Sequence, residues 1–245
     1  MSSPGQHRVL FDPAQADPFP LSRTKLALFL ECPRCFYLDR RLGISRPDNA
    51  VYSLNLAVDH LLKREFDHYR LKGEPHPVMQ LFGIEAVPFR HKELTTWRDT
   101  MRGVRSVHHE SNFEVFGIVD DLWVHEDGSV AVVDYKATSS PMTPTLDGRE
   151  SYLRQLEIYQ WLLRQNGLTV SDTAYILFAN ASKEKESFNR TLEFTLSVHP
   201  YIGSDAWVED ALLAAKEALM QVQPPPSTQG CVWCKYRRET RGAED

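Results

Sequence analysis

Residues 113–136 read FEVFGIVDDLWVHEDGSVAVVDYK, two short apolar runs separated by a glycine-containing turn. Runs rich in Val, Ile and aromatic residues on either side of such a turn are typical of a β-hairpin. Because side chains alternate between the two faces of a strand, Asp134 and Lys136 point to the same side. The stretch therefore predicts a hairpin that presents an acid and a lysine together.

The register of this hairpin decides which upstream acid lies opposite Asp134, because a slip of one residue exchanges the two faces. A three-residue loop, 126–128, places Asp120 opposite Asp134, whereas a two-residue turn, 127–128, places Asp121 there. Both registers are compatible with the sequence. We favour Asp120, because its neighbours on the same face are apolar.

Two carboxylates on the buried face of an apolar hairpin repel each other, so they are expected to hold a cation or a proton. Mg²⁺ or Mn²⁺ binds carboxylate, water and phosphate oxygens and can generate a nucleophilic hydroxide. Lys136 could then hold the attacking water or stabilise the phosphate. The alternative is a surface hairpin in which Lys136 and Asp134 form an ordinary ion pair and Asp121 is solvated.

Three sequence elements, taken in order, carry a resemblance to a known family. They are Gly117-Ile118-Val119-Asp120, Val132-Val133-Asp134-Tyr135-Lys136, and Gln155 followed four residues later by Tyr159. In this order they resemble the RecB-type branch of the PD-(D/E)xK nucleases. The resemblance implies that Asp120 and Asp134 bind a divalent metal, that Lys136 assists the hydrolytic water, and that Gln155 and Tyr159 line the site. It also implies an α/β, restriction-endonuclease-like core, with a central mixed β-sheet flanked by helices.

Residues 151–166 have leucines and aromatic residues at helical spacing and end just before Gly167, which predicts a helix with a glycine C-cap. Gln155 and Tyr159 are then neighbours on one face of this helix. The alternative is that Tyr159 packs in the core and Gln155 is exposed. The order of the three elements favours the first interpretation, in which Gln155 and Tyr159 line the site.

The family has a further metal ligand on an upstream helix, and residues 54–70 are the candidate helix. On a helical wheel, Glu65 falls within the apolar stripe of this segment, where a carboxylate needs a partner. His60 falls nearly opposite, but it matches the residue type that the family uses. Glu65 and His60 are therefore competing predictions for a third ligand.

The four cysteines form two C-x-x-C pairs, Cys32 with Cys35 and Cys231 with Cys234. Four thiolates suit either a tetrahedral zinc ion or a [4Fe-4S] cluster. The RecB-like exonucleases associated with CRISPR systems resemble this chain in joining both ends of the nuclease domain through four cysteines, which implies the iron-sulfur cluster, with Zn²⁺ as the alternative. We expect the site to clamp the N- and C-terminal segments together.

The composition is that of an ordinary globular protein: 245 residues, 42% hydrophobic and 25% charged. It predicts one domain over residues 21–245 after a mobile N-terminal arm over residues 1–20. The absence of a signal peptide or membrane-spanning stretch predicts a cytoplasmic protein.

The net charge of -5 argues against a protein that binds nucleic acid over its whole surface, but basic residues cluster after each cysteine pair. They predict a DNA-binding surface, with a solvated basic edge as the alternative. The candidates are Arg34, Arg40, Arg41, Lys235, Arg237 and Arg238.

These features predict a divalent-metal-dependent DNA nuclease. By resemblance, its substrate would be single-stranded or end-containing DNA, cleaved by exonuclease or flap activity within a DNA-processing complex for DNA repair or CRISPR adaptation. One alternative is a non-catalytic DNA-binding or assembly module with a structural metal clamp. Another is a restriction-type endonuclease, which shares the hairpin but does not predict the terminal cysteine pairs.

Overall fold

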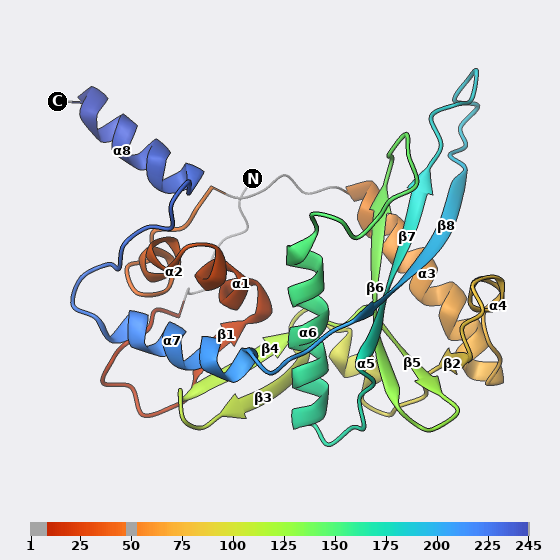
Figure 1. Cartoon of the computed structure of the whole chain (residues 1–245), viewed down its shortest axis with the longest axis horizontal. Helices are drawn as coiled ribbons and strands as arrows, with labels where there is room; N and C mark the ends of the chain where they lie inside the picture. Colours follow the sequence, from red (N-terminus) through yellow and green to blue (C-terminus); the bar gives the residue numbers. More distant parts are fainter. Residues whose placement is uncertain (1–8, 48–52, 245) are drawn as a thin grey trace. The chain divides into compact units, whose positions relative to one another are not determined.

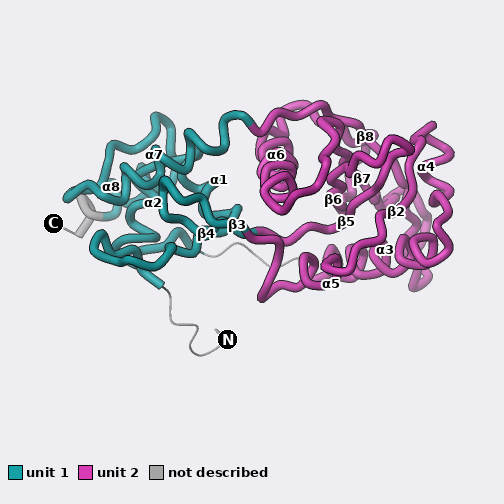
Figure 2. The backbone as a smooth tube through the Cα atoms, turned by 90° about the horizontal axis from the view of Figure 1, so that it is seen from below, with its two compact units in different colours: residues 1–49, 106–116, 206–245 teal, residues 50–105, 117–205 magenta. Residues whose placement is uncertain are grey.

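The computed structural model describes residues 9–47 and 53–244. The chain divides into two compact units, shown in Figure 2. Unit 1 comprises residues 1–49, 106–116 and 206–245, and unit 2 comprises residues 50–105 and 117–205.

Unit 2 is built on a five-stranded sheet with the strand order β2-β5-β6-β7-β8. The β6–β7 pair is parallel and the other neighbouring pairs are antiparallel, so the sheet is mixed. The strands are Ala86–Pro88, Asp121–His125, Val130–Thr138, Thr173–Ala181 and Phe194–Ile202, and the helices are α3 Ser53–Lys72, α4 Pro77–Leu81, α5 Leu94–Trp97 and α6 Glu150–Gln165. The predicted α/β fold class is confirmed.

The hairpin of β5 and β6 has the three-residue loop. Asp121 lies opposite Val133, which places Asp120 opposite Asp134. The loop ends in Gly128 at φ 82°, a left-handed conformation that glycine adopts at little cost. The favoured register is therefore the one that the chain adopts.

Two long helices flank this hairpin, and Figure 1 shows α3 and α6 on opposite sides of β6. Phe66 of α3 stacks on Trp123, with ring centroids 5.6 Å apart, in a core cluster that includes Tyr135. The face of β6 that carries Asp134 is turned toward α6, because Gln155 of that helix contacts it. Tyr135 and Asp134 thus point to opposite sides of one strand.

The buried face of α3 differs from the predicted apolar stripe. The apolar stripe expected over residues 54–70 includes Leu54, Leu61, Leu62 and Phe66, but Leu54 and Leu61 are 55% and 59% exposed. Leu62 and Phe66 are buried as expected, and Arg70 is buried beside them. The difference arises because Arg70 is part of the buried face, whereas a helical wheel assigns an arginine to the solvent-exposed face.

Most of a three-stranded sheet with the order β1-β4-β3 belongs to unit 1. Its strands are Phe19–Ser22, Phe113–Gly117 and Val104–His108. The helices of unit 1 are α1 Arg23–Glu31, α2 Pro33–Arg40, α7 Val208–Met220 and α8 Val232–Glu244. The α7 helix packs against α1 and α2. The α1 and α2 helices are separate because Cys32 is extended and Pro33 opens α2 at its first position.

Residues 1–8 of the expected N-terminal arm lie outside the described residues. In the part that follows them, Phe11 is only 4% exposed, and its ring lies edge-on to Phe19 at 5.4 Å. A mobile arm over residues 1–20 and a single domain over 21–245 stay predictions. Among the described helices, none has the length and apolar character needed to span a membrane.

Candidate active site and cysteine centre

Asp120 and Asp134 come together where β5 and β6 begin to pair. Asp134 is 1% exposed. Asp120 Oδ2 accepts a hydrogen bond from the Tyr135 backbone N–H at 3.0 Å, and the two carboxyl groups are close enough for Asp120 to raise the pKa of Asp134. The hairpin therefore holds two acids side by side on a largely buried surface.

The two carboxyl groups have opposite pKa shifts. Burial raises the pKa of Asp134 to about 7, with the Asp120 carboxylate adding to the rise and Lys136 opposing it. Burial also acts to raise the pKa of Asp120, but the Lys63 and Lys136 ammonium groups and the Tyr135 N–H outweigh it, so that this pKa is lowered. Neighbouring carboxyl groups shifted in opposite directions can share one proton, and a cation can replace that proton.

Three further predicted residues surround Asp134. Lys136 forms an ion pair with Asp134 Oδ2, and Gln155 Nε2 donates a hydrogen bond to Asp134 Oδ1 at 2.5 Å. The Tyr159 hydroxyl lies 3.5 Å from Gln155 Nε2, one helical turn along α6, and its side chain is buried. All five residues nominated by the family motifs are thus brought into one constellation.

The donor set fits a hard divalent cation. Asp120 and Asp134 offer carboxylate oxygens, and Mg²⁺ and Mn²⁺ prefer oxygen ligands. Although Lys136 faces it, the buried Asp134 Oδ2 accepts no hydrogen bond of ordinary geometry from the described residues. Asp134 Oδ2 is thus paired with the Lys136 ammonium group and is the oxygen that a bound cation would contact, whereas Oδ1 is already oriented by Gln155.

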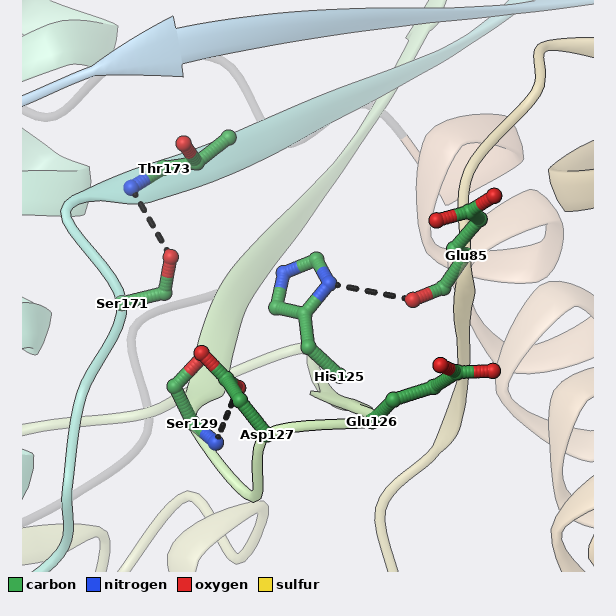
Figure 3. A pocket seen from close by; sticks show the side chains of 7 residues that line it. All are labelled: Glu85, His125, Glu126, Asp127, Ser129, Ser171 and Thr173. Carbon is green, nitrogen blue, oxygen red and sulfur yellow. Dashed lines mark hydrogen bonds between the residues drawn. The ribbon is translucent and has the colours of Figure 1, made fainter.

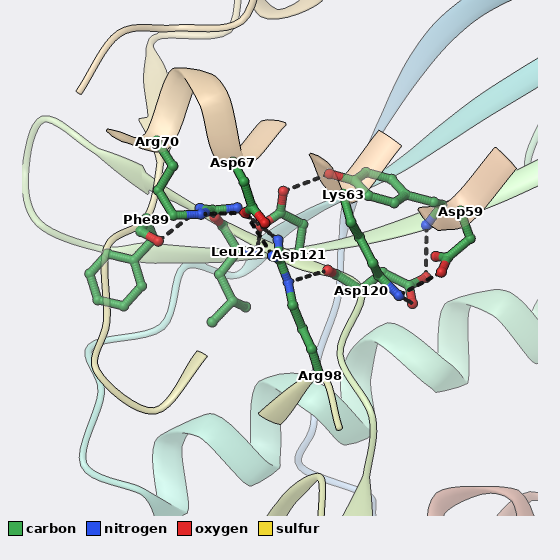
Figure 4. A network of polar contacts seen from close by, with 10 residues as sticks. Asp59, Lys63, Asp67, Arg70, Phe89, Arg98, Asp120, Asp121 and Leu122 are labelled. Atoms are coloured by element: carbon green, nitrogen blue, oxygen red, sulfur yellow. Dashed lines mark hydrogen bonds and ion pairs between the residues drawn. The ribbon is translucent and has the colours of Figure 1, made fainter. Parts of the chain in front are cut away.

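Asp59 and Lys63 of α3 belong to the same site, and sequence reasoning did not nominate them. Lys63 Nζ lies 2.8 Å from Asp59 Oδ2 and 3.1 Å from Asp120 Oδ1, as Figure 4 shows. The signal that could have found them is their i, i+4 spacing on the predicted helix. Tyr152 was also missed, and its ring lies 5.0 Å from Lys136 Nζ.

Asp121 faces away from Asp134 into a separate charged network, which Figure 4 also shows. It is fully buried. It accepts hydrogen bonds from Arg70 at 2.5 Å, Arg98 at 2.7 Å and the Tyr135 hydroxyl at 2.6 Å. Arg98 Nε in turn donates to the Asp120 backbone oxygen at 2.9 Å. The alternative of a solvated Asp121 is wrong, and the network instead fixes the backbone beside the site.

We expect Asp121→Asn to destabilise the protein by about 3 kcal/mol or more, because it leaves two guanidinium groups facing a buried, neutral amide. Urea unfolding followed by circular dichroism measures this change. The matched control is Asp147→Asn, at an exposed aspartate of the same unit, with an expected change within about 0.5 kcal/mol. Equal stability of the two variants would contradict a structural role for the network.

The two candidates for a third ligand lie elsewhere on α3. The Glu65 carboxylate pairs with His76 Nε2 at 2.9 Å and is 55% exposed, and His60 is exposed. Among the described residues, neither side chain forms a hydrogen bond or ion pair with Asp120 or Asp134. The third-ligand role of His60 or Glu65 stays a prediction.

An open hollow lies at the turn end of the same hairpin, shown in Figure 3. Its lining includes Glu85, His125, Glu126 and Asp127. It lies at the other end of β5 and β6 from Asp120 and Asp134, and it contains none of the nominated catalytic residues. We assign no chemistry to it, because exposed acidic groups of this kind are common at β-turns.

The four cysteines converge within unit 1. The Cys32 and Cys234 sulfur atoms are 3.8 Å apart, and Cys35 Sγ lies 3.7 Å from Cys231 Sγ and 3.6 Å from Cys234 Sγ. All four could hold a metal ion, since their sulfur atoms lie within 4.8 Å of one another. The predicted clamp of N- and C-terminal segments by a four-cysteine site is confirmed.

Arg46 lies beside this centre. Its Nη2 atom is 3.9 Å from Cys231 Sγ, and its Nη1 atom pairs with Glu31 at 2.5 Å. Four thiolates carry more negative charge than one divalent ion neutralises, so a nearby guanidinium stabilises the loaded centre.

Several residues of the predicted basic surface make contacts within unit 1. Arg40 pairs with Asp39 at 2.7 Å, the Arg41 guanidinium lies over the Phe11 ring at 5.9 Å, and Arg237 donates to the Ser45 carbonyl at 3.1 Å. Arg34 is half-buried, while Lys235 and Arg238 are exposed on α8. A DNA-binding role for these residues stays a prediction.

Comparison with known families decides the classification. The family model of the PD-(D/E)XK nuclease superfamily matches residues 20–238. The chain belongs to this superfamily. The predicted resemblance is therefore confirmed, and the four-cysteine cluster fits its RecB-type branch. PD-(D/E)XK proteins are usually nucleases that use divalent metals.

Among solved structures, the crystal structure of SSO0001 is similar to this nuclease-superfamily chain. The two are 15% identical, with 91% of this chain and 86% of that chain covered, at a TM-score of 0.41. No curated protein matches the chain.

Proposed function

We propose that this protein is a divalent-metal-dependent DNA nuclease that hydrolyses phosphodiester bonds at Asp120, Asp134 and Lys136. The observation that carries the proposal is the pairing of the two carboxyl groups, with an ammonium group against one of them. Membership of the nuclease superfamily supports the same chemistry.

Asp120 and Asp134 would hold the divalent ion, which when bound supplies a Lewis acid for the phosphate and lowers the pKa of coordinated water. Gln155 keeps Asp134 Oδ1 in place through its hydrogen bond of 2.5 Å. Lys136 donates hydrogen bonds to the attacking water and to the phosphate oxygen on which charge develops. Tyr152, whose ring lies under the Lys136 ammonium group, restricts where that group points.

We propose single-stranded or end-containing DNA as the substrate, within a cytoplasmic DNA-processing complex. The support is the resemblance to RecB-type nucleases. A Mg²⁺-dependent assay with linear single-stranded, circular single-stranded and blunt duplex DNA tests the proposal. We expect linear single strands to be degraded fastest and EDTA to stop the reaction. Absence of cleavage with both Mg²⁺ and Mn²⁺ would contradict a nuclease, while DNA binding without cleavage would support the binding module.

For the cysteine centre, we propose a single zinc ion. A tetrahedral zinc site with Zn–S bonds of about 2.3 Å places its sulfur atoms about 3.8 Å apart. Three of the sulfur pairs lie at 3.6 Å to 3.8 Å, and all four sulfur atoms lie within 4.8 Å of one another. In a [4Fe-4S] cluster each thiolate binds a different iron, which sets the sulfur atoms farther apart. Metal and acid-labile sulfide analysis after anaerobic purification tests this. Iron with sulfide would contradict zinc and favour the cluster that the family resemblance implies.

A further inference from the structure

A second ammonium group, that of Lys63, contacts Asp120 in the candidate active site. Lys63 Nζ lies 2.8 Å from Asp59 Oδ2 and 3.1 Å from Asp120 Oδ1, as Figure 4 shows. Its side chain is 19% exposed, and so is that of Asp120. Lys63 is therefore held between two carboxylates rather than extended into solvent.

Lys63 occupies a position that a second metal ion could take. In two-metal phosphodiesterases, one carboxylate bridges two cations about 3.5–4 Å apart, and further acids complete each coordination shell. Here Asp120 lies beside Asp134 in the hairpin, and its Oδ1 atom contacts the Lys63 ammonium group. Asp59 is the second carboxylate that contacts Lys63. A second metal ion at this place would likewise need a second acid as a ligand.

The backbone keeps Lys63 there. It lies on α3 directly after Leu62 and three residues before Phe66, both of which are buried. Asp59 is one helical turn earlier, so the same helix positions both partners. Because an ammonium group is a compact point charge with three donors, it can satisfy two carboxylates at once.

We propose that the Lys63 ammonium group takes the place of a second divalent cation, so that the site binds one ion, at Asp120 and Asp134. This inference rests on the proposed nuclease function. Asp59 is then a partner of Lys63 and not a ligand of the ion, and Lys63 is a positioning residue that holds Asp120 through its Oδ1 atom.

The test is the number of Mn²⁺ ions bound per chain, measured by calorimetric titration of the full-length protein with its cysteine centre left as purified. We expect one ion for the wild type and two for Lys63→Met, because the substitution frees Asp59 and one Asp120 oxygen. Lys63→Arg retains the charge and should bind one ion. Arg64→Met, at the next and exposed position of α3, is the matched control and should also bind one.

Asp59→Asn provides an independent check that does not depend on the folding of Lys63→Met. We expect one ion bound, with an affinity within about threefold of the wild type. Loss of Mn²⁺ binding in Asp59→Asn would make Asp59 a ligand and overturn the inference, as would a single ion in Lys63→Met. Failure of the nuclease function has a different signature, because the wild type would then leave DNA intact with both Mg²⁺ and Mn²⁺, whatever number of Mn²⁺ ions it binds.

Discussion

Asp134→Asn should reduce Mg²⁺-dependent DNA cleavage by about 10³-fold or more. The substitution keeps the size of the side chain and an oxygen for Gln155, but it removes the charge that would hold the cation. A metal ion contributes several kcal/mol to the stabilisation of a phosphoryl transition state, which corresponds to a loss of this order. Single-turnover cleavage of labelled DNA measures the effect, and Asp120→Asn should behave in the same way.

The matched control for this experiment is Asp127→Asn, at an exposed aspartate in the loop of the same hairpin. We expect it to cleave DNA at the wild-type rate. Lys136→Ala should also lose most of its activity, since it removes the donor to the attacking water. Unchanged cleavage by both Asp134→Asn and Lys136→Ala would rule out this active site.

Replacing Cys234 by serine should release the C-terminal helix and lower the stability of unit 1. Four thiolates around one structural zinc ion contribute about 10–16 kcal/mol of binding free energy, comparable to the whole folding stability of a typical domain. Because Cys32 and Cys234 come from opposite ends of the chain, this binding energy joins the two ends. Limited proteolysis with mass spectrometry should detect new cleavage sites in α8, together with loss of the bound metal.

Val232 provides the control for the cysteine experiment. It lies on the same helix between Cys231 and Cys234 and is 67% exposed, so Val232→Ser should retain the metal and the protease resistance of the wild type. Equal metal content and equal resistance in Cys234→Ser would show that the cysteines do not form a structural centre.

The hairpin could be predicted because local rules determine it, whereas its register was the favoured one of two that the sequence allowed. Gly128 allows the left-handed end of a three-residue loop, and that loop length sets Asp120 opposite Asp134. The same holds for α6, whose i, i+4 spacing places Gln155 and Tyr159 on one face. The division into two units, each with its own sheet, was not predicted. It depends on β1 pairing with β4, which is distant in sequence.

The residues that the sequence did not reveal depend on long-range charge pairing. Arg70 is buried because it meets Asp121, so that α3 buries Leu62, Phe66 and Arg70 while Leu54 and Leu61 stay exposed. On the same helix Lys63 contacts Asp120, and Glu65 pairs with His76. A helical wheel scores arginine and lysine as solvent-facing, so it cannot anticipate a helix that buries Arg70 and half-buries Lys63 against acids of other elements.

A crystal grown with Mn²⁺, with anomalous scattering used to locate the ion, tests the central claim most directly. We predict a peak about 2 Å from a carboxylate oxygen of Asp120 and from one of Asp134, with Gln155 still bound to the other oxygen of Asp134. A peak confined to the acidic hollow at Glu85, Glu126 and Asp127, with none between Asp120 and Asp134, would contradict it.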